Sequence, residues 1–162
     1  MSDELAPRAE LAALLRGGQA HMTMAEAAAD FPPEAMNAVL PGATYTAWHL
    51  LDHIRLAQRD ILTFVTDPHY AEPAWPDDYW PAPGRQADAS VWQATLDGYH
   101  TDLDDLARLL ENPAMDLAAR VAHGSGQTML REFLLVADHT AYHIGEFAIM
   151  RQVTGTWPKG HV

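Results

Sequence analysis

The chain contains no cysteine among its 162 residues. This absence excludes a disulfide framework, a thiolate metal site and a cysteine nucleophile. Any thiol chemistry that the protein performs would therefore need a thiol supplied from outside the chain.

Long apolar runs are also missing. No stretch approaches the roughly 20 apolar residues that cross a bilayer, and the N-terminus has no basic segment followed by an apolar one. Hydrophobic residues make up 48% and charged residues 20%, which is typical of a globular protein. We therefore expect one domain over residues 1–162, in the cytoplasm.

Basic residues are scarce. Lysine and arginine number 10 against 22 acidic residues, Lys159 is the single lysine, and the formal net charge is −12. Nucleic-acid-binding proteins usually carry a basic patch, so we expect neither nucleic acid nor an anionic membrane as a partner. The negative field modestly favours a metal cation or a cationic ligand, although solubility is its main effect.

Helical periodicity dominates the rest of the chain. Segment 89–112 is the cleanest, because its large apolar residues recur at the spacing of one helix face. The other helices are expected over 4–16, over 24–30 behind a capping box of Thr23 and Glu26, from Thr44 or Thr46 to about Thr66, and from Thr128 to Gly155. Whether the first two form one bent helix stays open. This order of elements predicts an all-α fold, a four-helix bundle.

Between the middle helices, residues 69–88 lose all periodicity. Four prolines alternate there with Trp75, Tyr79 and Trp80, which excludes a continuous helix or strand. Loops of this length are uncommon in compact domains and often serve as lids or interface segments. The alternative is that these aromatic residues cover an open end of the bundle.

The last expected helix carries two histidines four residues apart, His139 and His143. Such residues share a helix face, with Cβ atoms roughly 5–6 Å apart, so both imidazoles can reach one metal ion. An apolar stripe includes His143 and borders His139; its other members are Met129, Phe133, Val136, Thr140, Phe147 and Met150. Imidazoles facing a core need polar partners, since an unsatisfied buried polar group costs roughly 1–3 kcal/mol.

A third ligand is offered by His53 in the 46–66 helix, where Leu50, Ile54 and Ala57 indicate an inward face. Three imidazoles leave at least one coordination position open, which is typical of a catalytic site. The alternative is that the paired histidines hydrogen-bond within the core.

Two further residues are candidates for supporting roles at this site. His49 is a possible fourth ligand, but we favour a role behind the ligands or in the core. Glu146 shares a face with His143 and could orient it, hold a metal-bound water or act as a catalytic base. A solvated position at the bundle edge is the alternative. His21, His69, His123 and His161 receive no role.

These motifs resemble the DinB/YfiT-like superfamily of metalloenzymes. The resemblance is carried by Trp48–Leu62, by Ala137–Glu146 with Arg151 and Gly155-Thr156-Trp157-Pro158 behind it, and by the loop Pro73–Pro81. It covers nearly the whole chain from Pro41 onward.

The resemblance implies an up-down-down-up bundle, often a homodimer, that binds a divalent ion such as zinc, nickel or iron. Carried over by position, the ligands are His53, His139 and His143. Glu146 stands where many relatives are expected to have glutamine. The resemblance therefore does not specify the bond that this residue makes to a ligand or to water.

Characterised relatives include S-transferases that use bacillithiol and an isomerase that depends on mycothiol. The resemblance therefore implies a metal-dependent, thiol-dependent S-transferase acting on a small electrophilic substrate. Superfamily membership does not fix the reaction. A metal-dependent hydrolase or isomerase with a metal-activated water, and a non-catalytic metal-binding stress-response protein, stay open as alternatives.

Overall fold

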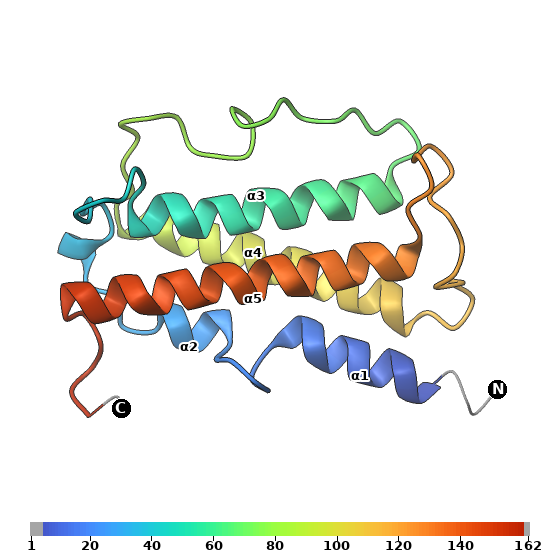
Figure 1. Cartoon of the computed structure of the whole chain (residues 1–162), viewed down its shortest axis with the longest axis horizontal. Helices are drawn as coiled ribbons and strands as arrows, with labels where there is room; N and C mark the ends of the chain where they lie inside the picture. The colour runs from blue at the N-terminus through green and yellow to red at the C-terminus, as the bar shows by residue number, and fades with distance from the viewer. Residues whose placement is uncertain (1–4, 161–162) are drawn as a thin grey trace.

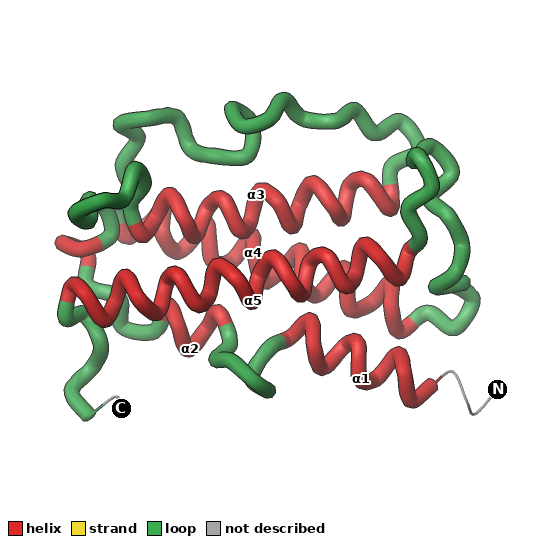
Figure 2. The backbone as a smooth tube through the Cα atoms, viewed as in Figure 1, coloured by secondary structure: helices red, strands yellow, loops and turns green. Residues whose placement is uncertain are grey.

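The computed structural model describes residues 5–160, and this part of the chain is all-helical (Figures 1 and 2). Its α-helices are α1 (Leu5–Arg16), α2 (Met24–Ala28), α3 (Ala47–Thr66), α4 (Ala89–Glu111) and α5 (Met129–Thr154), with a 3₁₀ turn at Pro33–Ala35. No strand occurs within residues 5–160. The expected all-α class is confirmed. The predicted first residue of the first helix, Glu4, and His161 lie outside the described residues.

Side chains just before three helices set where those helices begin. Thr46, Asp88 and Thr128 precede α3, α4 and α5, and each side chain accepts a backbone N–H from the first turn. The capping box of Thr23 and Glu26 opens α2 as predicted. These bonds satisfy backbone donors that have no partner inside the helix.

The first two helices are separate and do not form one bent helix. Gly17 and Gly18, both with positive φ, follow the last residue of α1. The short α2 ends at Ala28, two residues before the predicted end, because the backbone leaves the helical conformation at Ala29, with a ψ of 134°, and Asp30 has a φ of 50°.

Arg151 closes this end of the molecule. It is fully buried, and its guanidinium donates to the carbonyls of Ala27, Ala29 and Thr156. Arg151 also places a positive charge in the last turn of α5, beside the C-terminus of that helix. It ties α2 and the segment after α5 to the bundle.

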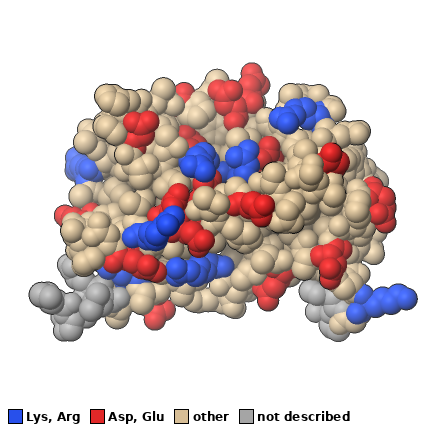
Figure 3. All heavy atoms as spheres, turned by 180° about the vertical axis from the view of Figure 1, so that it is seen from behind, with Lys and Arg blue, Asp and Glu red and all other residues tan. Residues whose placement is uncertain are grey.

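The helices pack as a bundle around one apolar core (Figure 1). α3 packs against both α4 and α5, while α1 packs against the same two helices and α2 against α5. After α3 the chain runs back along the bundle through residues 67–88, so that α3 and α4 begin at the same end (Figure 1). Seen from behind, the surface carries interspersed acidic and basic side chains (Figure 3).

The long connection was expected either as a lid or interface segment or as a cover for a bundle end. It follows the flank of α3 (Figure 2). The apolar stripe of α5 is confirmed, since all its predicted members except Met129 are buried. Within residues 5–160, no helix combines the length and the apolar character that crossing a bilayer requires.

Candidate metal centre

Three histidines converge between α3 and α5. His53 comes from α3, His139 and His143 come from α5, and one nitrogen of each lies within 4.8 Å of the other two. The ring centroids are 5.0 Å apart for His53 and His139, 4.8 Å for His53 and His143, and 4.4 Å for the two on α5. The structure therefore brings together the three residues that the sequence indicates as ligands, in an arrangement that could hold a metal ion.

The tautomer of His53 is set by a residue of the long loop. Its Nδ1–H donates to the backbone carbonyl of Tyr79 over 2.8 Å. A carbonyl only accepts, so in the neutral ring the lone pair lies on Nε2. Trp80 stacks on the same imidazole, with centroids 3.9 Å apart and planes 4° from parallel. His53 is thus covered by the loop, and its free nitrogen faces His139.

Glu146 sets the tautomer of His143 in the same way. The Nδ1–H of His143 donates to Oε2 of Glu146 over 2.6 Å, and the hydroxyl of Tyr45 donates to Oε1 of the same carboxylate over 3.4 Å. The lone pair of His143 therefore lies on Nε2. This contact orients the ring of His143, which is one of the roles that the sequence allows for Glu146.

The ring of His139 forms a triangle with these two rings. Its Nε2 is 3.2 Å from Nε2 of His53, which carries a lone pair. Two lone pairs at that distance repel, so a proton on His139 or a shared cation must lie between them. Burial, and then the nearby His143 and His53, lower the pKa of His139 to about 3. Burial also lowers the pKa of His53. Both rings are neutral at pH 7, the state in which imidazole binds metal.

The spacing suits a small cation. Two nitrogens bound at 2.0–2.1 Å in a tetrahedron lie about 3.3 Å apart, close to the 3.2 Å between His53 and His139. The nitrogens of all three histidines lie within 4.8 Å of one another, so the widest separation in the cluster is somewhat larger than the tetrahedral spacing. Each of His53 and His143 also has its second nitrogen bonded to an acceptor, which is the usual support behind a metal ligand.

A carboxylate on α3 anchors the loop that covers the centre. The hydroxyls of Tyr70 and Tyr79 both donate to Asp60, over 2.8 and 2.7 Å. Burial and these hydrogen bonds raise the pKa of both tyrosines above the usual value. Tyr79 is therefore held to α3 by its side chain, and its carbonyl is held against His53.

The remaining histidines lie elsewhere. His49 is buried, but its Nε2–H donates to the carbonyl of Arg85 over 2.9 Å, so it supports the loop and is not one of the three clustered rings. His123 packs its ring against Phe64 and Tyr70.

A cavity of about 550 Å³ adjoins the centre. Its wall includes Trp80, Tyr45, His49 and Arg85, but none of the three clustered histidines. Trp80 and Tyr45 therefore border the cavity and also contact the centre, through His53 and Glu146 respectively.

Sequence reasoning missed three supports of this centre: the Tyr79 carbonyl, the Trp80 ring and the Asp60 anchor. The sequence shows the aromatic residues of the loop, but no local pattern pairs them with α3. Comparisons with protein-family models, with curated proteins and with solved structures give no match for this chain.

Proposed function

We propose that this chain is a metal-dependent enzyme of the DinB/YfiT-like superfamily, in which His53, His139 and His143 hold one divalent ion. The observation that carries the proposal is their convergence within 4.8 Å, with two of the three tautomers set by the Tyr79 carbonyl and Glu146. The up-down-down-up order of the helices belongs to the same proposal, and the common starting end of α3 and α4 is compatible with it.

The most concrete form of this proposal is a thiol-dependent S-transferase. It forms a bond between the sulfur of a low-molecular-weight thiol, such as bacillithiol or mycothiol, and the electrophilic carbon of a small substrate. The bond from that carbon to its leaving group breaks, and the thiol proton departs with that group. A divalent ion held by three imidazoles supplies Lewis acidity and lowers the pKa of a thiol beside it. The chain supplies neutral ligands in fixed orientations, with Trp80 shielding His53 from water. The absence of cysteine agrees with a nucleophile that comes from outside.

The main alternative, a hydrolase or isomerase, needs Glu146 as a base acting on water. Its Oε2 is instead 2.6 Å from Nδ1 of His143, the ring nitrogen that is not free to bind the ion. Its Oε1 is approached by the hydroxyl of Tyr45. This placement favours a positioning role for Glu146, and with it the thiol-dependent form of the proposal.

Metal content tests the proposal first. The protein, expressed without a histidine tag, should contain about one equivalent of zinc, nickel or iron by elemental analysis. The folded variants His53→Ala and His139→Ala should contain none, while His69→Ala, in the long loop, should keep the full amount. Absence of metal in the native protein, even after reconstitution with zinc, nickel and manganese, would overturn the proposal.

Turnover then separates the functional classes. The loaded protein is incubated with small electrophiles in the presence and in the absence of thiols. Product that requires both thiol and metal supports the transferase. Product without thiol supports the hydrolase or isomerase. Unchanged reactivity on removal of metal supports a non-catalytic metal-binding protein.

A further inference from the structure

The cavity beside the three histidines has the size of a small-molecule site. Its volume is about 550 Å³, which lies within the usual range for such sites. Its lining comes from the segment that leads into α3 and from the last part of the long loop, and Val39, Pro81 and Pro83 give it apolar surface. The cavity can therefore hold an organic molecule and not only an ion.

Two aromatic rings of the wall favour a flat ligand. The rings of Tyr45 and Trp80 have centroids 5.2 Å apart and planes 35° from parallel. One face of the Trp80 indole already stacks on His53, so the cavity meets its other face or its edge. Aromatic faces and edges both pack well against a further ring. A molecule with a flat apolar portion would therefore fit this wall.

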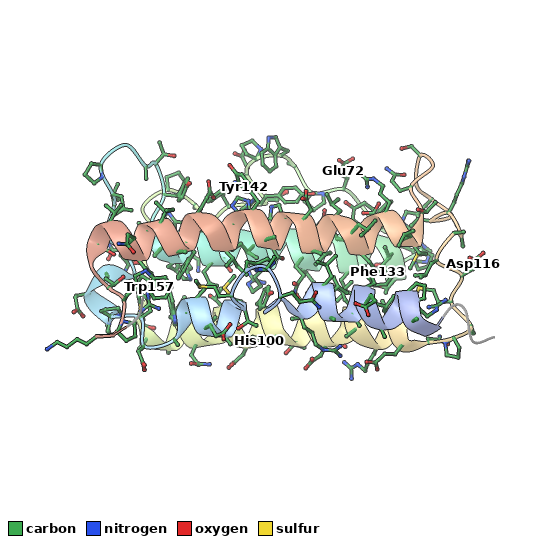
Figure 4. All side chains as sticks on the ribbon, turned by 60° about the horizontal axis from the view of Figure 1, so that its bottom comes forward. Glu72, His100, Asp116, Phe133, Tyr142 and Trp157 are labelled. Carbon is green, nitrogen blue, oxygen red and sulfur yellow. The ribbon has the colours of Figure 1, made fainter. Side chains whose placement is uncertain are left out.

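The cavity is basic, although the chain is acidic. Within residues 5–160, Arg85 is the one charged side chain of the lining apart from the titratable His49, and no aspartate or glutamate lines the cavity. The whole chain has 22 acidic residues against 10 basic ones. Figure 4 shows Glu72, an acidic residue of the long loop, away from the start of α3, and this residue borders a different pocket. An anion in the cavity would therefore meet a cation and no carboxylate of the lining.

The guanidinium of Arg85 is available to a ligand. It forms neither an ion pair nor a hydrogen bond with another residue in the range 5–160, and its Cζ lies 5.6 Å from the ring centre of the buried Trp48. That separation is within the range of a cation–π contact. A guanidinium binds a carboxylate through two parallel N–H···O bonds. One arginine balances the single charge of a carboxylate, whereas a phosphate monoester carries nearly two charges.

The backbone around Arg85 is fixed before any ligand arrives. Its N–H donates to the carbonyl of Ala82 over 3.0 Å, and its own carbonyl accepts the Nε2–H of His49 over 2.9 Å. The side-chain amide of Asn37 bonds both the N–H and the carbonyl of Ala87, each over 2.8 Å. A binding segment that is already ordered costs less entropy when the ligand binds.

We propose that this cavity binds a small aromatic carboxylate, with the carboxylate on Arg85 and the ring against Tyr45 and Trp80. The ligand would lie next to the indole that stacks on His53, so the inference also names a substrate class for the proposed enzyme. It rests on the cavity and on Arg85, and not on the metal centre, so either proposal can fail without the other.

Three probes of the same shape test the charge preference. Naphthoate, naphthylmethanol and naphthylmethylammonium share one ring system, and calorimetric titration measures their affinities for the purified protein. We expect the carboxylate to bind most tightly, the alcohol less tightly and the ammonium most weakly. The negative net charge of the chain alone would favour the ammonium. Equal affinities, the reverse order, or no binding of any probe overturns the proposal.

An arginine variant tests the anchor. Arg85→Gln should weaken naphthoate by about three- to tenfold, because it removes a charge-assisted pair that is partly open to solvent, and should leave naphthylmethanol nearly unchanged. Arg120→Gln is the matched control, since it removes the same charge at an exposed position of the connection between α4 and α5. Equal effects of the two variants on naphthoate overturn the role of Arg85.

A tyrosine variant tests the place of the ring. Tyr45→Ala should weaken naphthoate and naphthylmethanol alike by several-fold, because both lose an aromatic wall. Tyr142→Ala, which makes the same change on α5 outside the cavity, should weaken neither. Circular dichroism checks that each variant is folded. A folded Tyr45→Ala variant that binds both probes as the native chain does overturns the proposed location.

His139→Ala separates this inference from the proposed function. His139 does not line the cavity, so the variant should bind naphthoate as tightly as the native chain even though it holds no metal. Loss of binding in His139→Ala, with binding retained in Arg85→Gln, would show that the carboxylate binds a metal ion, and would overturn the inference. Binding that depends on Arg85 in a native protein without metal would uphold the inference and overturn the metal centre alone.

Discussion

The imidazole of His53 donates its Nδ1–H to the carbonyl of Tyr79, 26 residues further along the chain, over 2.8 Å. This one bond connects the long loop to the candidate metal centre. It fixes which ring nitrogen of His53 is free, and it depends on where the loop lies. The loop is held in turn by the Tyr79 hydroxyl on Asp60.

Tyr79→Phe should therefore loosen the centre without touching a ligand. Loss of a hydroxyl bond to a carboxylate should lower the free energy of unfolding by about 1–2 kcal/mol. The Tyr79 carbonyl remains, but the loop holds it less firmly against His53. Metal affinity should therefore fall by up to about tenfold, which is the lower limit of the usual effect of changing a residue that supports a metal ligand. Thermal unfolding and competitive metal titration measure the two effects.

Tyr70→Phe is the matched control. Tyr70 donates to the same carboxylate over a similar distance, but its backbone carbonyl is not the one that His53 contacts. We expect a similar loss of stability with metal affinity retained. Equal losses of metal affinity in both variants would mean that Asp60 acts through general stability and not through His53.

Glu146 gives the second prediction. In Glu146→Gln the amide oxygen can still accept the Nδ1–H of His143, whereas in Glu146→Ala no acceptor remains. Metal affinity should therefore fall by about 10–100-fold in Glu146→Ala and much less in Glu146→Gln. Glu10→Ala, at an exposed position of α1, controls for loss of one negative charge. If Glu146→Gln kept its metal but lost nearly all turnover, Glu146 would be a base and the orienting role would be wrong.

The helices were predictable because their ends depend on local chemistry. The side chains of Thr46 and Thr128 cap the helices that follow them, and Gly155 takes the left-handed conformation that ends α5. The predicted end of α2, Asp30, lies two residues beyond its observed end at Ala28. The carbonyls of Ala27 and Ala29 are bonded by Arg151, more than 120 residues away, and no window of sequence shows such a contact.

The cluster was predictable in its three histidines and not in the residues that support them. His139 and His143 share a helix face by spacing alone, and apolar neighbours turn His53 inward. The acceptor for His53 is a backbone carbonyl, and every residue has one. Only the path of the loop selects the carbonyl of Tyr79, and that path depends on contacts between distant segments.

Arg151 gives the third prediction. Arg151→Lys keeps a positive charge, but one ammonium group cannot reproduce three bonds to carbonyls on two segments. Because the site is fully buried, the unpaired carbonyls should lower the free energy of unfolding by about 2–4 kcal/mol. Arg108→Lys, in an exposed pair with Asp105, should change it by less than about 0.5 kcal/mol. Urea denaturation measures both, and equal effects would refute the role of Arg151.

The pKa of His139 gives the fourth prediction, for the protein freed of metal by a chelator. This pKa is near 6.5 in the unfolded chain and is lowered to about 3 in the folded one. Between these values the unfolded state binds more protons. The contribution of His139 to stability is therefore complete above pH 6.5 and is lost as pH falls toward 3, by at most about 1.4 kcal/mol per pH unit.

The window from pH 6.5 to 5 isolates this effect, because most carboxylates titrate below it. Stability measured by urea denaturation should fall across the window in the native chain. The fall should be shallower in His139→Gln and unchanged in His69→Gln, which alters a histidine of the long loop outside the centre. His53, whose pKa is also lowered by burial, should account for part of the slope that remains. Equal slopes in all three proteins would show that His139 is not buried in the metal-free fold.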